Sequence, residues 1–262
     1  MYYFSYATTE GIVKKINQDA LMIKTARYGS NHILMSAVCD GMGGLSGGET
    51  ASSFVITGVS DWFESTYPSL LREESNILKI RQSLDELLHI LNDDINKSCA
   101  KGSPMGTTFT GILIDPALNI MLAAHVGDTR LYKIYSDRLE IVTSDHSVVA
   151  EEVRRGVISA EQAMNDTRQN QITNCIGAGE KNRVYDYIMQ PPEKDCLYML
   201  CSDGFRKMVT EEELIKYLSP DVNNDNLSIG KNLEFLVNLN MQRMENDNIT
   251  ALAVKYTGVN EN

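Results

Sequence analysis

Short runs of apolar residues, or of alternating apolar and polar residues, recur along the chain and are bounded by Gly, Asp or Asn. Runs of this length with such boundaries are typical of β-strands. The pattern predicts strands over Tyr2–Ala7, Ala20–Thr25, Ile33–Cys39, Thr107–Ile114, Ile120–Val126, Leu131–Tyr135, Leu139–Val142, Cys196–Cys201 and Ile249–Tyr256.

Elsewhere the apolar residues follow the spacing of an α-helix. The clearest stripe runs from Ile77 to Ile95 and predicts one amphipathic helix. A second long helix is predicted from about Glu49 to Phe63, after a glycine-rich turn. Shorter helices are predicted near Val148–Arg155, Glu211–Leu218 and Ile229–Arg243.

The order of these elements indicates the fold class. Strands mostly follow strands through short turns and helices come in blocks, which favours an α+β fold over a doubly wound parallel sheet. We expect antiparallel sheets covered by helices. No internal repeat or Pro/Gly/Ser-rich linker divides the chain, so one domain over residues 1–262 is predicted. The segment Asp145–Gly179 is the least regular part and is predicted to be a mobile insertion.

Composition excludes several classes of protein. The chain has 24 Lys and Arg against 35 Asp and Glu, a net charge of −11, so neither nucleic acid nor an anionic membrane is an expected partner. Met1–Glu10 lacks the features of a signal peptide, and runs such as Ile33–Cys39 are too short to span a membrane. The five cysteines form no Cys-x-x-Cys pair, which is typical of reduced thiols in a cytoplasmic protein.

Aspartates stand where predicted strands begin or end. Asp40 follows Ile33–Cys39, and the others take similar places; the set is Asp19, Asp40, Asp128, Asp203 and Asp247. Carboxylates clustered beside a core must take up protons or hold a cation. A ligand set of oxygens alone favours Mg²⁺ or Mn²⁺, and a glycine such as Gly41 would let its carbonyl join the ligands. The alternative is that each Asp-Gly pair only forms a turn.

Other motifs give weaker signals. The four histidines include no His-Glu-x-x-His, and no phosphate-binding loop of the Gly-x-x-x-x-Gly-Lys type occurs. Gly44-Leu45-Ser46-Gly47-Gly48 matches the nucleophile elbow of serine hydrolases, so a serine hydrolase acting through Ser46 is one alternative. The predicted strand ends at Asp40, however, so Ser46 would not lie on the sharp strand-to-helix turn that this motif requires.

Taken in order, several segments carry a more specific signal. They are Asn17-Gln18-Asp19, Cys39-Asp40-Gly41-Met42-Gly43-Gly44, Gly106-Thr107-Thr108, His125-Val126-Gly127-Asp128-Thr129-Arg130, Ser144-Asp145-His146-Ser147, Ile172-Thr173 with Ile176-Gly177, Leu200-Cys201-Ser202-Asp203-Gly204 and Asp247-Asn248-Ile249-Thr250. Over nearly the whole chain this series resembles the protein phosphatase 2C (PPM) family, especially its compact bacterial members.

The resemblance implies a fold and an activity. The fold would be a sandwich of two antiparallel sheets with helices on both sides and a flap over about 145–179. The activity would be metal-dependent hydrolysis of phosphoserine and phosphothreonine in proteins, by a metal-activated water and without a phosphoenzyme. A bacterial member of this family usually opposes a Ser/Thr kinase that shares its substrates, and we expect a monomer.

The resemblance also implies roles for individual residues. Asp40 would bridge two Mn²⁺ or Mg²⁺ ions, with the Gly41 carbonyl on one of them and Asp203 and Asp247 on the other. Asp19 would hold a water bound to the metal. Asp128, together with Asp203, would bind the third ion that is common in bacterial members.

Two positions depart from the pattern of the family. Lys14 stands where an arginine usually binds the substrate phosphate, so Lys14, Asp40 and Asp203 are the predicted catalytic residues. A lysine lacks the bidentate fork of arginine, so we expect weaker phosphate binding. Met42 replaces a histidine of eukaryotic members and cannot donate a proton. Two alternatives stay open: a catalytically weak or dead member that binds phosphoproteins, and another metal phosphohydrolase or nuclease.

Overall fold

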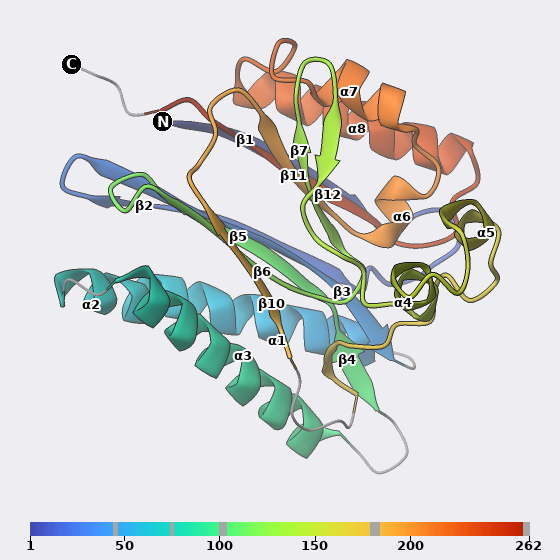
Figure 1. Ribbon diagram of the computed structural model, residues 1–262, viewed down its shortest axis with the longest axis horizontal. Helices are drawn as coiled ribbons and strands as arrows, with labels where there is room; N and C mark the ends of the chain where they lie inside the picture. The colour runs from blue at the N-terminus through green and yellow to red at the C-terminus, as the bar shows by residue number, and fades with distance from the viewer. Residues whose placement is uncertain (44–46, 74–75, 100–103, 179–183, 259–262) are drawn as a thin grey trace.

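The structure is a computed structural model that describes residues 1–43, 47–73, 76–99, 104–178 and 184–258. The chain forms four layers, with helices outside two stacked antiparallel sheets (Figure 1). The predicted α+β sandwich with helices on both sides is therefore confirmed. Ser46 and its neighbours 44 and 45 lie outside the described residues.

The first sheet has five strands and brings the two ends of the chain together. Tyr2 at the start of the first strand lies opposite Tyr256 at the end of the last one. In spatial order the strands are β1 (Tyr2–Thr9), β12 (Ile249–Tyr256), β11 (Leu197–Cys201), β7 (Arg130–Ile134) and β8 (Leu139–Ile141).

The second sheet has seven strands, and the longest of them, β3 (Asn31–Gly43), pairs with three neighbours. One neighbour, β2 (Asp19–Tyr28), pairs with β3 alone. The spatial order of the others is β10 (Asp186–Gln190), β6 (Ile120–Val126), β5 (Phe109–Asp115), β3, β4 (Met105–Thr107) and β9 (Ile176–Gly177).

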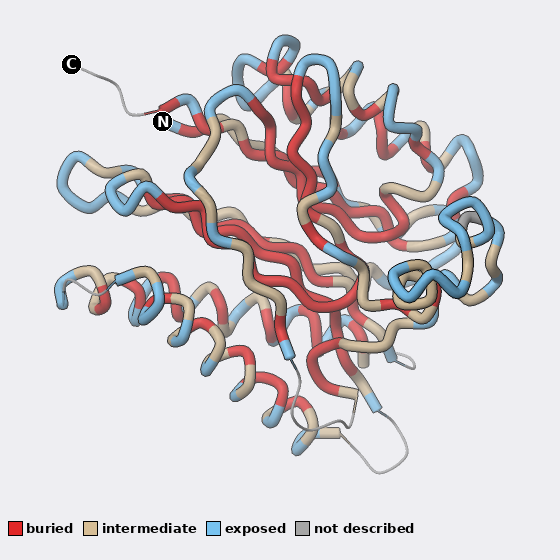
Figure 2. Tube along the Cα trace, in the orientation of Figure 1, coloured by how far each residue is buried: buried red, intermediate tan, exposed pale blue. Residues whose placement is uncertain are grey.

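Three apolar clusters hold these layers together, and Figure 2 shows the buried residues concentrated in the strands. Strand β11 shows why: Tyr198 and Leu200 belong to the cluster between the sheets, while Met199 belongs to the cluster under the outer helices. Both faces of the strand are covered, so its sequence is a continuous apolar run and not an alternating one.

Helices complete the outer layers. The second sheet is covered by α1 (Gly47–Asp61) and α3 (Ile77–Ser98), and the first by α7 (Glu211–Leu218) and α8 (Asn226–Gln242) (Figure 1). Helix α1 continues through a π-helical turn, Trp62–Thr66, into α2 (Tyr67–Arg72). No helix in the described ranges is long and apolar enough to span a membrane.

Helix α3 offers a matched test of this packing. Leu88 is fully buried against the second sheet, whereas Ile90 on the same helix is 58% exposed. We expect Leu88→Ala to lower the free energy of unfolding by about 2–5 kcal/mol, because it removes buried methyl groups and leaves a cavity. Ile90→Ala should change it by less than about 0.5 kcal/mol. Urea unfolding of both variants checks this, and equal losses would contradict the assigned face.

The predicted elements differ from the structure at informative places. The predicted strand Ile33–Cys39 extends to Gly43, so Asp40 lies within β3 and not after it. The predicted strand Thr107–Ile114 is interrupted at Thr108, whose hydroxyl accepts a hydrogen bond from the Asp40 backbone at 2.8 Å. Strand β10 was not predicted, because its residues are only partly buried and carry no clear period.

The segment 145–178 contains regular structure in its first half. It forms α4 (Val148–Arg154) and α5 (Ala160–Met164), which lie beside the end of the sandwich that carries α6 (Asp203–Arg206) (Figure 1). Arg168 joins this segment internally through ion pairs with Glu152 and Asp166, both at 2.7 Å. That the segment is a mobile flap, and that residues 1–262 form one domain, stay predictions.

Candidate active site

The other four predicted aspartates gather around Asp40. Asp19, the first residue of β2, lies opposite Asp40 in the register with β3. Asp128 follows β6, Asp203 begins α6 directly after β11, and Asp247 precedes β12. Four separate segments, which come from both sheets, therefore carry carboxylates to one place. Their negative charges all act on Asp40.

Burial, together with the closeness of these carboxyls, raises the pKa values of Asp40 and Asp19. Burial raises the pKa of Asp40 well above its usual range, and the charges of Asp19, Asp203, Asp128 and Asp247 raise it further. Burial likewise raises the pKa of Asp19 to about 7, although hydroxyls of Thr250 and Ser202 lie near enough to lower it in part.

Asp128 behaves in the same way. Burial, followed by the charge of Asp203, raises its pKa to about 7, while Arg206 and Lys207 oppose the rise. Carboxyls with pKa values raised by mutual repulsion gain from a cation placed among them.

Unpartnered oxygens show that the cluster suits a hard cation. Both carboxylate oxygens of Asp19 and Oδ1 of Asp203 are buried and have no hydrogen-bond partner among the described residues. Buried carboxylate oxygens normally have partners, and oxygen-only sets are the ligands that Mg²⁺ and Mn²⁺ prefer. In the part of the chain that the structure describes, no three acidic, His or Cys side chains are spaced as ligands of a single ion. Basic side chains hold some of these carboxylates instead.

Three basic residues contact the cluster. Lys14 Nζ lies 3.1 Å from Asp247 Oδ1, and the Lys14 side chain is 43% exposed, which places its charge at the solvent side of the site. Lys207 Nζ lies 2.5 Å from Asp203 Oδ2. Arg206 Nη2 lies 3.9 Å from Asp128 Oδ2. The sequence predicted Lys14 at this site but missed Arg206 and Lys207.

Asn248 positions the loop that carries Lys14. Its buried side chain accepts a hydrogen bond from Gln18 N at 3.0 Å and donates to the carbonyls of Glu10 at 3.1 Å and Ile16 at 3.0 Å. The side-chain amide of Asn248 thus forms hydrogen bonds to residues at both ends of the loop that carries Lys14. Asn248 stands in a quoted motif, but its role could not be seen in the sequence because its partners lie more than two hundred residues away.

Gly41 lies where a side chain could not fit. A Cβ at this position would come within 2.1 Å of the Gly48 carbonyl and 2.6 Å of the Gln18 carbonyl. The glycine therefore lets β3 pass close to the start of α1. The Gly41 N–H donates to Gln18 O at 3.1 Å, which ties β3 to the loop before Asp19. Its carbonyl as a metal ligand stays a prediction.

Two histidines support the loop that carries Asp128. His146 contacts Gly127 through the backbone and accepts from Gly127 N at 3.3 Å, and its Nε2 lies 3.0 Å from Asp186 on β10. His125 is buried between Thr110 and the Ser144 carbonyl. Burial, followed by the nearby His146, lowers the pKa of His125 to about 4, so it is neutral at pH 7. Both histidines therefore have a structural role in this structure, because their contacts hold the loop that carries Asp128.

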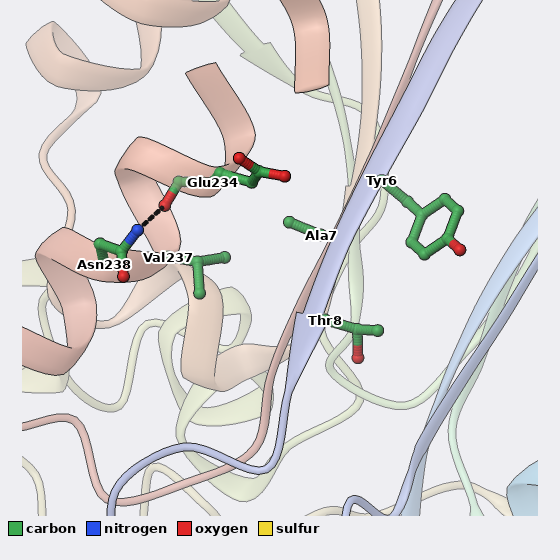
Figure 3. Close-up of a pocket in the computed structure, with 6 residues that line it drawn as sticks. All are labelled: Tyr6, Ala7, Thr8, Glu234, Val237 and Asn238. Atoms are coloured by element: carbon green, nitrogen blue, oxygen red, sulfur yellow. Dashed lines mark hydrogen bonds between the residues drawn. The ribbon is translucent and has the colours of Figure 1, made fainter. Parts of the chain in front are cut away.

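One hollow lies apart from the aspartates, between β1 and α8. Figure 3 shows Glu234, Val237 and Asn238 of α8 on one side and β1 on the other. Asn238 Nδ2 donates to the Glu234 carbonyl at 2.9 Å. The only charged residue lining this hollow among those described is an acid, so it offers no counter-charge for a phosphate group. The aspartate cluster is the better candidate for chemistry.

Comparisons with known proteins agree with this geometry. The serine/threonine phosphatase stp of Listeria welshimeri is 32% identical over 222 residues, which cover 83% of this chain and 82% of that protein. A Streptococcus pyogenes relative named for the protein phosphatase 2C type is 28% identical over 251 residues, covering 95% and 96%. No family model matches the chain.

Solved structures share the whole fold. The S. agalactiae serine/threonine phosphatase superposes with a TM-score of 0.81 at 27% identity, covering 97% of this chain and 99% of that chain. The catalytic domain of the phosphatase PstP, solved in complex with two manganese ions, has a TM-score of 0.72 at 23% identity and covers 97% and 99%.

Fold, aspartate cluster and relatives together define a phosphatase. The chain belongs to the bacterial serine/threonine phosphatases of the protein phosphatase 2C type. Members of this class are hydrolases that act on phosphate esters of serine and threonine in proteins.

Proposed function

We propose that this chain releases phosphate from phosphoserine and phosphothreonine of other proteins at the cluster around Asp40. The observation that carries the proposal is the convergence of five aspartates, in which the charges of the other four all act on Asp40. A phosphate monoester is among the slowest esters to hydrolyse, so its cleavage needs concentrated positive charge. The cluster is built to hold such charge in the form of divalent cations.

The proposed ligands follow from their places in the cluster. Asp40, the Gly41 carbonyl, Asp203 and Asp247 would hold two ions, Mn²⁺ or Mg²⁺. The family resemblance implies Asp128 with Asp203 for a third ion, and the basic residues beside those two carboxylates decide whether it binds. When bound, such ions act as Lewis acids that lower the pKa of water and stabilise charge on phosphoryl oxygens. The manganese found in the PstP structure supports this choice.

The protein's own groups would orient the reactants. Asp19, with both oxygens unpartnered among the described residues, is placed to accept hydrogen bonds from the attacking water. Lys14, at the solvent side of the cluster, would bind the substrate phosphate through its ammonium group. Lys14, Asp40 and Asp203 are thus the proposed catalytic residues, and no step requires a covalent phosphoenzyme.

We propose a cytoplasmic setting for this activity, as a monomer. The substrates would be phosphorylated proteins, and a Ser/Thr kinase acting on the same proteins would be the functional partner. The net charge of −11 disfavours nucleic acid substrates and anionic membranes. The presence of all five aspartates in one cluster supports a catalytic member over one that only binds phosphoproteins.

The test is phosphate release from a phosphothreonine peptide with Mn²⁺ and with excess chelator. We expect turnover that requires the metal. Turnover that persists in chelator and is lost in Ser46→Ala would instead favour a serine hydrolase. Tight binding of the phosphopeptide without turnover, with either Mn²⁺ or Mg²⁺, would favour the phosphoprotein-binding alternative and overturn the proposed activity.

Lys14 gives a second, more specific expectation. Lys14→Ala should raise KM for the phosphopeptide by about tenfold or more, since a charge-assisted hydrogen bond contributes about 1.5–3 kcal/mol. Lys14→Arg should lower KM, because guanidinium binds phosphate in a bidentate manner. The neighbouring Lys15 is exposed, and Lys15→Ala is the matched control. Equal increases in KM for Lys14→Ala and Lys15→Ala would contradict a specific contact between Lys14 and the phosphate. They would show that substrate binding depends only on the total charge of the loop.

A further inference from the structure

Two consecutive basic residues, Arg206 at the end of α6 and Lys207 directly after it, reach the aspartate cluster. Lys207 follows Asp203 by four residues, and its Nζ reaches Asp203 Oδ2 at 2.5 Å. The pair is largely shielded from water, with side-chain exposures of 21% for Lys207 and 9% for Asp203. It is therefore unlike the solvated surface pairs that contribute little.

Other acids also face Lys207. Burial by itself would lower its pKa, but Asp203, Asp247 and Glu245 raise it overall. Glu245 is buried, and one of its oxygens has no partner among the described residues. The charges of three carboxylates from two different segments therefore act on Lys207.

Arg206 acts on the neighbouring carboxylate. Its Nη2 lies 3.9 Å from Asp128 Oδ2 and 3.4 Å from both the Asp128 carbonyl and Asp145 Oδ2. Asp145 is held in turn by a bidentate pair with Arg130, at 2.8 Å for each bond. The guanidinium of Arg206 is thus fixed next to Asp128 through a chain of ion pairs.

Asp128 and Asp203 are the two carboxylates proposed for a third ion, and each already has a cation beside it. An ammonium and a divalent cation at the same carboxylate repel each other, and the repulsion is stronger where water screens it less. A tethered ammonium also has a high effective concentration at its partner. A divalent ion entering from solution must therefore displace Lys207 or share the oxygen with it.

Asp203 still has one oxygen available as a ligand for the two proposed ions. Its Oδ2 pairs with Lys207, whereas its buried Oδ1 has no hydrogen-bond partner among the described residues. One oxygen can thus ligate a metal while the other remains neutralised by the protein. We propose that Lys207, supported by Arg206, takes the place of a third divalent cation at Asp128 and Asp203, so that this chain binds two ions and not three.

This inference rests on the proposed function, because it assumes that Asp40 and its neighbours hold metal. Lys207 acts through Asp203 and is a positioning residue. Its test therefore measures metal binding directly, by equilibrium dialysis against Mn²⁺ up to about 1 mM, the weak end of the affinity range over which oxygen-ligand sites are known to vary. Bound metal is counted per chain in wild type, Lys207→Met, Lys207→Arg and the exposed charge control Lys231→Met.

We expect two bound ions in wild type, in Lys207→Arg and in Lys231→Met. Lys207→Met should bind a third ion at least about tenfold more tightly than wild type does, since the competing charge is gone. In chelator, Lys207→Met should also melt at a lower temperature than wild type, because Asp203 has lost its counter-ion. Added Mn²⁺ should reduce this difference in melting temperature between Lys207→Met and wild type.

Three ions bound by wild type with the affinities of Lys207→Met would overturn the inference and leave the proposed function standing. Two ions in both proteins would also overturn it, since Lys207 would then not be what excludes the third. No Mn²⁺ bound by wild type would overturn the proposed function and this inference together. A count of three ions on wild type overturns the inference even where the methionine variant does not fold.

Discussion

Asp40→Asn is expected to lower kcat/KM for a phosphothreonine peptide by about 10³-fold or more in the presence of Mn²⁺. Asp40 is the residue on which the charges of all four other aspartates act, so it would be a central ligand of the ions when they are bound. Removing one carboxylate from such a site costs several kcal/mol of transition-state stabilisation. Each ~1.36 kcal/mol corresponds to a tenfold change in rate. The measurement is phosphate release at saturating metal.

The same substitution should have the opposite effect on the metal-free fold. Burial and four neighbouring acids raise the pKa of Asp40, so a neutral amide removes repulsion and should raise the melting temperature in chelator. Asp115→Asn is the matched control, because Asp115 is a fully buried carboxyl that accepts from Tyr67 and Asn31, away from the cluster. It should lose stability and keep its kcat/KM. Full activity in Asp40→Asn would remove Asp40 from the mechanism.

The sequence predicted the layers of the fold because burial on both faces leaves a direct pattern. Strands β6 and β12 were predicted with their observed bounds, since each lies between two apolar clusters and reads as an unbroken apolar run. The half-covered strand β10, Asp186–Gln190, has no such run and was not predicted.

The aspartates were predicted for a similar local reason, since each adjoins an apolar strand that must end at the sandwich. What surrounds them was harder to predict. Lys207 has the helical spacing of four residues from Asp203, a signal that was present in the sequence but is common among exposed helix pairs. Asn248 has partners at Glu10 and Ile16, and only the pairing of β1 with β12 brings these together.

The metal-free protein is expected to lose stability as the pH rises from about 4 to about 7. Burial raises the pKa of Asp19 and of Asp128 to about 7, against about 4 in the unfolded chain. Between these values the folded state binds more protons than the unfolded state, so stability falls with rising pH. His125 opposes this, because its pKa falls to about 4 from 6.5 and it favours folding as pH rises between those values. The three carboxyls Asp19, Asp128 and Asp40 together outweigh the single imidazole of His125. The stability of the metal-free protein therefore falls overall as the pH rises over this range.

Bound Mn²⁺ should reverse the trend, because a cation replaces the protons that the carboxyls otherwise need. The difference in melting temperature between protein in Mn²⁺ and protein in chelator should therefore widen from pH 5 to pH 8. His125 contributes equally to both curves and cancels from this difference. In Asp128→Asn the chelator curve should be flatter, since one raised carboxyl is gone. A difference that stays constant across this range, or that narrows, would mean that the aspartates do not exchange protons for metal.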